Sequence, residues 1–458
     1  MAASNKITGY SGPPQKELWG HPIGLYVLFL TEMWERFSYY GMRAILVLFL
    51  VSKVDDVNPG YGWTDAEALS LYGTYTMLVY LASIPGGVLA DKMLGQKKTV
   101  LLGGLLLVGG HSVLAIEALW AFYTGLGLII LGVGCLKPNI STMVGGLYRA
   151  GDERRDKGFI IFYIGINVGA FLASLLVGYV GEVYGWHYGF GLAGIGMLIG
   201  MLVYLWGQKY LKGVGEYIGA ADNPDSAAMN RPLTQVEKDR MLVMFLSFFL
   251  IIVFWGAFEQ AGGLMNLYAD NKTDRMLGGF EVPASWFQSV NAFFIITLGT
   301  AVAGFWYKWK IKGREASSLF KMAIGLIIMG WGFLFMSKAS TEVVMNGKEV
   351  VEKSAMIWLV LAYLFHTVGE LCASPVALSF ITKLAPVKYA SFMMGAYFAA
   401  TGLGNKVAGT IGEYSAQAWE FQIFTGIAVF CTIFGFIVLA MLKPLKRLTH
   451  GAEDLQNG

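Results

Sequence analysis

Long apolar runs alternate along this chain with short polar segments. Twelve runs approach or exceed the roughly 20 residues that a helix needs to cross a bilayer. They lie at 23–51, 67–91, 98–117, 119–147, 158–181, 188–211, 240–268, 285–311, 316–338, 355–384, 386–412 and 416–442. The least distinct break falls between the third and fourth runs, where only Glu117 and its neighbours interrupt the apolar stretch. The pattern predicts an all-α polytopic membrane protein with about twelve transmembrane helices.

The composition supports this interpretation. Of 458 residues, 55% are hydrophobic and 14% are charged, whereas about 25% of the residues in an ordinary soluble domain are charged. The formal net charge of +3 comes from basic loops, so we expect no nucleic-acid partner. The N-terminus lacks the apolar core of a signal peptide. We therefore expect the first helix to stay in the mature protein.

Basic residues mark every second loop, as the positive-inside rule requires of the cytoplasmic side. The opposite loops are mainly acidic. This alternation predicts that both termini are cytoplasmic. The basic loop residues are Lys92, Lys97 and Lys98; Arg149, Arg154, Arg155 and Lys157; Lys209, Lys212, Arg231, Lys238 and Arg240; Lys308, Lys310, Lys312 and Arg314; Lys383 and Lys388; and Lys443, Lys446 and Arg447.

A polar segment at 212–240 divides the predicted helices into six before it and six after it. Transporters built from repeated halves show this arrangement and bind substrate near the bilayer midplane. The predicted regions are an N-terminal six-helix bundle at 1–211, a cytoplasmic linker at 212–239, a C-terminal six-helix bundle at 240–445 and a cytoplasmic tail at 446–458.

The first apolar run contains four ionisable residues, Glu32, Glu35, Arg36 and Arg43. Each such side chain costs roughly 2.5 to 3.5 kcal/mol at the centre of a membrane helix, so these residues must be paired or must face water. At about 100° per residue, Glu32, Arg36 and Arg43 fall on one stripe, and Glu35 lies beside it. The spacing predicts a polar face that looks into the protein.

Lys137, Glu259 and Glu370 are further ionisable residues within apolar runs. Lys137 precedes Pro138, near a helix irregularity that can open backbone groups to a cavity. The alternative for Lys137 is an inert buried ion pair with a glutamate of the first run. A cavity with cations from one half and glutamates from the other would suit a zwitterion, whose carboxylate binds the cations and whose ammonium binds the glutamates.

The chain lacks the motifs of ATP use and of hydrolysis. It contains no Gly-x-x-x-x-Gly-Lys-Ser/Thr, His-Glu-x-x-His or Gly-x-Ser-x-Gly sequence. Cys135, Cys372 and Cys431 are scattered through apolar runs, and we assign them no disulfide or metal. We expect no cofactor, no metal and no enzymatic activity. A channel or a membrane-embedded enzyme remains the alternative from a different class.

Three segments carry recognisable signatures. Residues 32–41, EMWERFSYYG, contain Glu-x-x-Glu-Arg, and residues 162–169, FYIGINVG, contain Phe-Tyr-x-x-Ile-Asn-x-Gly. Residues 87–95, GVLADKMLG, precede two lysines and are less specific. Together they resemble the proton-dependent oligopeptide transporter family of the major facilitator superfamily, along almost the whole chain. The resemblance implies a major-facilitator fold of two six-helix bundles.

The resemblance further implies proton-coupled symport of di- and tripeptides by alternating access. The implied proton-coupling residues are Glu32, Glu35, Arg36 and Lys137. The implied substrate-binding residues are Arg43 and Lys137 for the peptide carboxylate, Asn167, Asn291 and Glu370 for its amino terminus, and Tyr40, Tyr80 and Trp255 for the pocket walls. Arg43 and Glu259 would form the extracellular gate. The expected partners are small peptides, protons and membrane lipid, and we expect a monomer in a bacterial cell inner membrane.

Some positions depart from the family pattern. Gly73 follows Tyr72 where many relatives have a histidine, which excludes a protonation role there. Tyr397 stands where relatives often have tryptophan. The segment 212–240 is too short and too polar for the two additional helices that bacterial relatives commonly insert.

Two questions stay open at this point. Some members of the family carry nitrate or another small solute, and Glu370 would not help to bind a purely anionic substrate. His366 lies one helical turn before Glu370, so the two side chains could form a hydrogen bond and a second proton site. The alternative is a histidine that only packs or orients Glu370.

Overall fold

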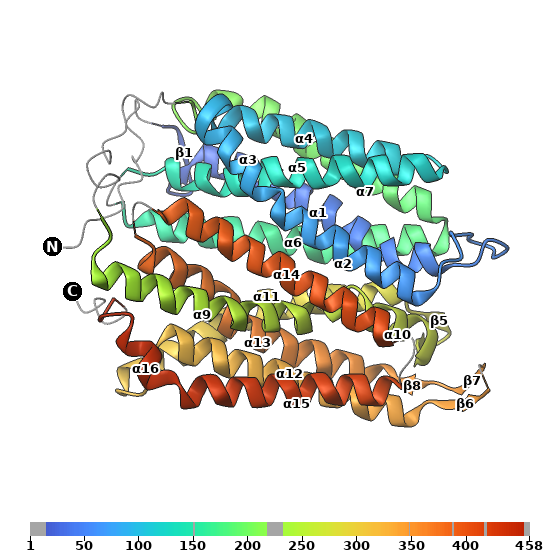
Figure 1. Cartoon of the computed structure of the whole chain (residues 1–458). Helices are drawn as coiled ribbons and strands as arrows, with labels where there is room; N and C mark the ends of the chain where they lie inside the picture. Colours follow the sequence, from blue (N-terminus) through green and yellow to red (C-terminus); the bar gives the residue numbers. More distant parts are fainter. Residues whose placement is uncertain are drawn as a thin grey trace. The chain divides into compact units, whose positions relative to one another are not determined.

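The computed structural model describes residues 15–149, 152–217, 232–347, 349–386, 389–415 and 419–452, and helices dominate it (Figure 1). Helices occupy each of the twelve ranges predicted from the apolar runs. The least distinct break is confirmed, because one helix ends at Leu114 and the next begins at Leu119.

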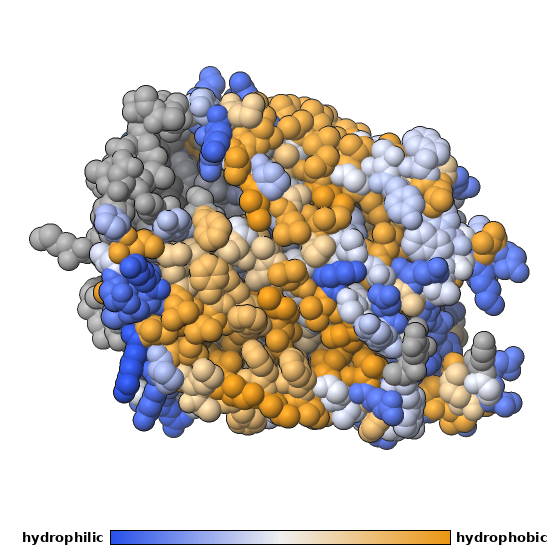
Figure 2. Space-filling model, viewed as in Figure 1, coloured by the Kyte–Doolittle hydropathy of each residue, from blue (hydrophilic) through white to orange (hydrophobic). Residues whose placement is uncertain are grey.

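The helices have the length and the surface of membrane-spanning segments. Nine helical segments within the described residues are long and apolar enough to cross a membrane, and one of these runs from Asp65 to Leu114. Helix α1, Ile23–Val51, carries four ionisable side chains and is not among the nine. Large apolar side chains stay exposed on helix flanks, for example Phe249 at 63%, and Figure 2 shows many such side chains on one face. The chain is therefore an all-α polytopic membrane protein, and the count of about twelve crossings stays a prediction.

The chain forms two compact units. Unit 1 comprises Met1–Phe49, Val54–Gly60 and Leu78–Pro224, and unit 2 comprises Leu50–Lys53, Tyr61–Met77 and Asp225–Gly458. Half of the predicted linker, at 218–231, and the end of the predicted tail, at 453–458, lie outside the described residues. The predicted domain bounds therefore stay a prediction.

Unit 1 is built mainly from long helices. They are α1, then α3 (Ser83–Leu89), a π-helical turn η1 (Ala90–Leu94), α4 (Gly95–Leu114), α5 (Leu119–Gly146), α6 (Arg154–Val183), α7 (Trp186–Gly207) and the 3-10 turn η2 (Gln208–Tyr210). Two short antiparallel strands, β1 (Glu17–Leu18) and β2 (His21–Pro22), precede α1. Small residues bring α4 and α5 close together, because a Cβ atom on Gly103 would lie only 2.7 Å from the carbonyl oxygen of Gly132. Small residues commonly allow such a close approach between membrane helices.

Unit 2 contains the remaining long helices. They are α9 (Gln235–Phe258), the 3-10 turn η4 (Glu259–Ala261), α10 (Leu264–Lys272), the 3-10 turn η5 (Ala284–Trp286), α11 (Phe287–Ile311), α12 (Ser318–Glu342), α13 (Met356–Leu384), α14 (Ala390–Ser415), α15 (Glu420–Ala440) and α16 (Leu442–Arg447). Helix α2, Asp65–Leu81, belongs to unit 2 as far as Met77.

Short strand pairs complete unit 2. The parallel pair is β3 (Thr273–Asp274) with β8 (Ser354–Ala355), and the antiparallel pairs are β4 (Met276–Leu277) with β5 (Phe280–Glu281) and β6 (Val344–Asn346) with β7 (Glu349–Glu352). Thr234 and Glu237 form a reciprocal capping box that starts α9. These elements connect the long helices that carry the candidate site residues.

Candidate functional site

Helix α1 carries a buried ion-paired cluster. Arg36 lies one turn after Glu32, which places these two side chains on the same helix face, and it directly follows Glu35. The Arg36 Nε atom is 3.0 Å from the Glu32 Oε1 atom, and Arg36 also forms a close ion pair with Glu35. None of the three residues is more than 3% exposed. Loss of charge on either carboxylate would leave the arginine with one fewer buried partner.

Tyr40 links this cluster to the second arginine of α1. Its ring centroid is 5.8 Å from the Cζ atom of Arg36 and 4.9 Å from the Cζ atom of Arg43. Such cation–π contacts favour a fixed position of a guanidinium group in a site with little water. Arg43 is 8% exposed. The charged stripe predicted for α1 is therefore present and buried.

Lys137 lies at an irregular point of α5. Pro138 has no N–H group, so the carbonyl of Gly134 loses its usual helical partner. The backbones of Gly134 and Gly86 meet there, because a Cβ atom on Gly86 would overlap the carbonyl of Gly134. The side-chain amide of Asn139 donates to the Gly86 carbonyl at 3.3 Å. The proline and the two glycines thus place Lys137 where α3 and α5 touch.

Tyr80 is the aromatic partner of Lys137. It lies in the last turn of α2, which ends at Leu81 because Pro85 cannot donate a helical hydrogen bond to the carbonyl of residue 81. The Nζ atom of Lys137 is 4.0 Å from the centroid of the Tyr80 ring. Among the described residues, Lys137 forms no ion pair with a carboxylate, so the predicted alternative of an inert ion pair with a first-helix glutamate is wrong in this conformation.

Asn167 lies on α6 and is 5% exposed. Its Nδ2 atom donates to the backbone carbonyl of Tyr163 at 2.9 Å, one turn earlier on the same helix. This contact orients the amide and leaves its side-chain oxygen to accept a hydrogen bond, which is what a peptide ammonium group offers.

In unit 2, Asn291 and Glu370 form a hydrogen-bonded pair between α11 and α13. The Asn291 Nδ2 atom donates to the Glu370 Oε2 atom at 2.9 Å and to the Thr367 Oγ1 atom at 3.0 Å. Thr367 is held in turn by a 2.7 Å bond to the carbonyl of Tyr363. The two residues expected to receive an amino terminus are therefore brought together, and Thr367 is a supporting residue that the sequence analysis missed.

Glu259 begins the 3-10 turn η4 that follows α9, and it is 3% exposed. The hydroxyl of Tyr72 donates to the Glu259 Oε2 atom at 2.9 Å. In the sequence, Tyr72 is notable only as the neighbour of Gly73, and no spacing rule connects it with Glu259. Arg43 belongs to unit 1 and Glu259 to unit 2, so their pairing as a gate stays a prediction.

Trp255 and Tyr397 are the aromatic candidates of unit 2. Trp255 packs edge-on against Phe258 with ring centroids 5.3 Å apart. Tyr397, on α14, is 7% exposed. Their role as pocket walls stays a prediction.

Of the two possibilities left open for His366, the structure supports the packing histidine and not a hydrogen bond with Glu370. Neither ring nitrogen of His366 has a hydrogen-bond partner among the described residues, and the side chain is 1% exposed. The ring lies 4.4 Å from that of Phe333, and a Cβ atom on Gly332 would be 2.6 Å from the imidazole Cδ2 atom. Because Gly332 has no side chain, α12 leaves room for the imidazole of His366. The ring packs against α12 and forms no hydrogen bond with Glu370.

Gly73 lies at a tight crossing of α2 and α14. A Cβ atom there would be 2.7 Å from the Cα atom of Gly409. A histidine could not fit at this position without separating the two helices, which gives a physical reason for the departure noted in the sequence.

One further charged residue lies within a predicted apolar run and was not recognised from the sequence. Lys406 falls within the predicted span 386–412, and its Nζ atom donates to the Thr74 Oγ1 atom at 2.9 Å. The adjacent Asn405 is 1% exposed, and neither of its amide atoms has a hydrogen-bond partner among the described residues. The rarity of charges within apolar runs is the signal that identifies Lys406.

Buried ionisable side chains on several helices, held by an ion pair, by hydrogen bonds or by aromatic rings, are a property of ion-coupled transporters, in which such groups mark ion and substrate pathways. The fold and the site together indicate a polytopic membrane protein of the transporter class. The model of the POT family matches residues 97–221 and 223–425. The chain belongs to the POT family.

Individual relatives match over nearly the full length. A peptide transporter of Yersinia enterocolitica, YePEPT, is 35% identical, with 98% of this chain and 99% of the relative covered. A di-/tripeptide transporter of Lactococcus lactis subsp. cremoris is 34% identical, with 95% of this chain and 98% of the relative covered. The crystal structure of a peptide transporter POT in complex with sulfate is 35% identical, with a TM-score of 0.86 and 95% of this chain and 97% of that chain covered.

Proposed function

We propose that this chain is a proton-coupled symporter that imports di- and tripeptides across a bacterial inner membrane by alternating access. The observation that carries the proposal is the burial of Glu32, Glu35 and Arg36 as one ion-paired cluster on α1. The full-length similarity to transporters named for peptides supports the substrate class. The proposal includes no catalytic step and no cofactor.

Protonation of Glu32 or Glu35 is the proposed coupling step. An ionised carboxylate holds Arg36, and a protonated one holds it less strongly, so protonation frees positive charge on α1. The membrane potential contributes about 2.3 kcal/mol per charge per 100 mV. This energy corresponds to roughly fiftyfold accumulation per proton before any pH gradient is counted.

The peptide carboxylate is proposed to bind Arg43 and Lys137. A guanidinium and an ammonium group both donate strongly to carboxylate oxygens. Each cation is held by an aromatic ring, Arg43 by Tyr40 and Lys137 by Tyr80. An aromatic ring positions a cation through its quadrupole and does not itself neutralise the charge.

The peptide amino terminus is proposed to bind Glu370, with Asn291 and Asn167 as further contacts. The amide of Asn291 donates to one oxygen of Glu370, and a carboxylate has further lone pairs with which to accept an ammonium group. Trp255 is assigned to the pocket wall. Arg43 and Glu259 are assigned to the extracellular gate.

Peptide-driven acidification in vesicles reconstituted with the full chain tests this function. Dialanine and trialanine should acidify the lumen, and a protonophore should abolish the signal. An N-acetylated dipeptide should give little response, because it lacks the ammonium group that Glu370 is proposed to bind. Nitrate tests the alternative substrate class. Acidification with nitrate and none with dialanine would overturn the proposal.

A further inference from the structure

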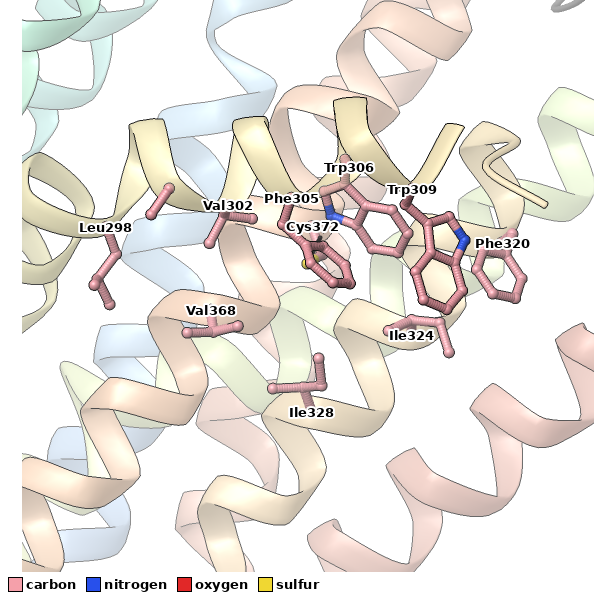
Figure 3. A pocket seen from close by; sticks show the side chains of 11 residues that line it. Leu298, Val302, Phe305, Trp306, Trp309, Phe320, Ile324, Ile328, Val368 and Cys372 are labelled. Atoms are coloured by element: carbon pink, nitrogen blue, oxygen red, sulfur yellow. Dashed lines mark hydrogen bonds between the residues drawn. The ribbon is translucent and has the colours of Figure 1, made fainter. Parts of the chain in front are cut away.

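Unit 2 contains a groove whose wall is almost entirely hydrocarbon, and none of the candidate site residues lines it. Its volume is about 500 Å³, and α11, α12 and α13 line it. In Figure 3, Phe305, Trp306 and Trp309 of α11 lie over Ile324 and Ile328 of α12. The groove therefore suits an apolar occupant.

The length of the groove matches one leaflet of a bilayer. Along α11 its lining extends from Leu298 to Trp309, which is about 16 Å at 1.5 Å per residue. Half of a hydrocarbon core of about 30 Å is about 15 Å. An acyl chain lying along α11 would thus occupy the groove from the midplane to the interface.

The two tryptophans of the groove do not offer their indole N–H groups to a ligand. The Trp306 Nε1 atom donates to the Cys372 Sγ atom at 3.3 Å, and the Trp309 Nε1 atom donates to the carbonyl of Glu315 at 2.9 Å. Both indole N–H groups are therefore engaged within the protein. A polar ligand would find no partner on these two walls, whereas a hydrocarbon chain requires none.

Two basic side chains lie near the end of the groove that Trp309 lines. The Arg314 Cζ atom is 4.5 Å from the Trp309 ring centroid, and the Lys321 Nζ atom is 5.5 Å from the Trp306 ring centroid. The segment 308–321 contains five basic residues and one acidic residue, Glu315. The Glu315 carboxylate is engaged by Lys446 at 3.1 Å. The mouth of the groove is therefore strongly positive.

We propose that this groove binds one acyl chain of an anionic phospholipid from the leaflet on the basic, predicted cytoplasmic side, with the lipid phosphate held by Arg314 and Lys321. The apolar wall selects a hydrocarbon chain, and the charge at its mouth selects an anionic headgroup over a zwitterionic one. This assignment does not depend on the substrate of the transporter.

Tryptophan quenching by brominated lipid tests the proposal. The full chain is reconstituted in phosphatidylcholine vesicles that contain a graded fraction of phosphatidylglycerol or phosphatidylcholine with brominated acyl chains. Subtraction of the fluorescence of a Trp306→Phe/Trp309→Phe variant isolates the two indoles of the groove. Brominated phosphatidylglycerol should reach half-maximal quenching at about a fivefold lower mole fraction than brominated phosphatidylcholine.

Three variants make the test specific, and the thermal unfolding midpoint of each verifies its fold. Arg314→Gln/Lys321→Gln should abolish the preference for the anionic lipid, whereas Lys443→Gln/Arg447→Gln, which removes the same charge from α16, should keep it. Ala301→Phe, which fills the groove, should reduce quenching by both lipids.

Several results would overturn the assignment. Equal quenching by the two lipids would mean that the groove meets bulk lipid without selection. Quenching by neither lipid would mean that something else covers the groove. A preference that survives Arg314→Gln/Lys321→Gln, or that is lost equally in Lys443→Gln/Arg447→Gln, would remove the proposed headgroup site.

Discussion

The ammonium nitrogen of Lys137 lies 4.0 Å from the centroid of the Tyr80 ring. An aromatic ring attracts a cation through its quadrupole and leaves the net charge unchanged. A carboxylate in the same place would have neutralised the lysine. The contact therefore positions Lys137 while leaving its charge available to a substrate carboxylate.

Removal of the Tyr80 ring should weaken peptide binding. A cation–π contact contributes about 1 to 2 kcal/mol at a site with little water, which corresponds to a rise of about 5- to 30-fold in the KM for dialanine. We expect this rise in Tyr80→Leu and a change of less than about twofold in Tyr80→Phe, which keeps the ring. Initial uptake rates in proteoliposomes measure both. Equal defects in the two variants would show that the hydroxyl, and not the ring, matters.

Asn291→Ala should weaken the binding of peptides that have a free amino terminus. The substitution removes the amide that orients Glu370, and a hydrogen bond to a charged group contributes about 1.5 to 3 kcal/mol. Thr297→Val is a matched control on the same helix, because the Thr297 hydroxyl donates to the backbone carbonyls of Phe293 and Phe294 on its own helix and, within the part of the chain that the structure describes, to nothing else. Competition by dialanine against a labelled peptide measures the effect. A control variant as defective as Asn291→Ala would contradict the assigned role.

Gly73→His should destabilise the protein. The added Cβ atom would meet the Cα atom of Gly409 at 2.7 Å, and overpacking of this kind costs about 1 to 3 kcal/mol. Gly109→Ala is the control, since nothing lies within 4 Å of a Cβ atom there. We expect a lower thermal unfolding midpoint in detergent for Gly73→His and no loss for the control. An unchanged midpoint in Gly73→His would mean that α2 and α14 separate without cost.

The sequence predicted those features that depend on local spacing or on composition. Apolar runs located the helices, and the spacing of Glu32 and Arg36 placed both residues on one helix face, where their ion pair is found. Contacts between distant segments could not be derived in this way. The bond from Tyr72 to Glu259 depends on how α2 packs within unit 2, and no periodicity contains that information.

His366 shows why spacing alone can mislead. Residues four apart do share a helix face, but a side chain moves to where space is available. Gly332 on α12 leaves that space because it has no side chain, and the imidazole of His366 packs there. The π-helical turn at Ala90–Leu94 was missed for a similar reason, since its residues continue an ordinary helical pattern.

Glu315 should contribute a pH-dependent part of the stability. Partial burial acts to raise the pKa of this carboxyl, but the backbone N–H of Ser317 and the ammonium group of Lys446 outweigh it and lower the pKa below its ordinary value of 4.5. A lowered pKa stabilises the folded state above the unfolded-state pKa, and this stabilisation is lost as the pH falls through the folded-state pKa.

The comparison of Glu315→Gln with the unmodified chain measures this contribution. At pH 7 the variant should have the lower thermal unfolding midpoint. The difference should shrink as the pH falls below 4.5, because the unmodified carboxyl becomes protonated as well. A difference that stays constant from pH 7 to the acid limit of the folded state would show that Glu315 acts through packing alone.

Proton-driven accumulation by Glu35→Gln tests the central claim most directly. Labelled dialanine is followed in proteoliposomes under an imposed pH gradient and potential, and separately in counterflow without either. The exposed Glu117→Gln is the control and should behave as the unmodified chain in both assays. We predict that Glu35→Gln retains counterflow but does not concentrate the peptide above its outside level. Full uphill accumulation by Glu35→Gln would contradict the account.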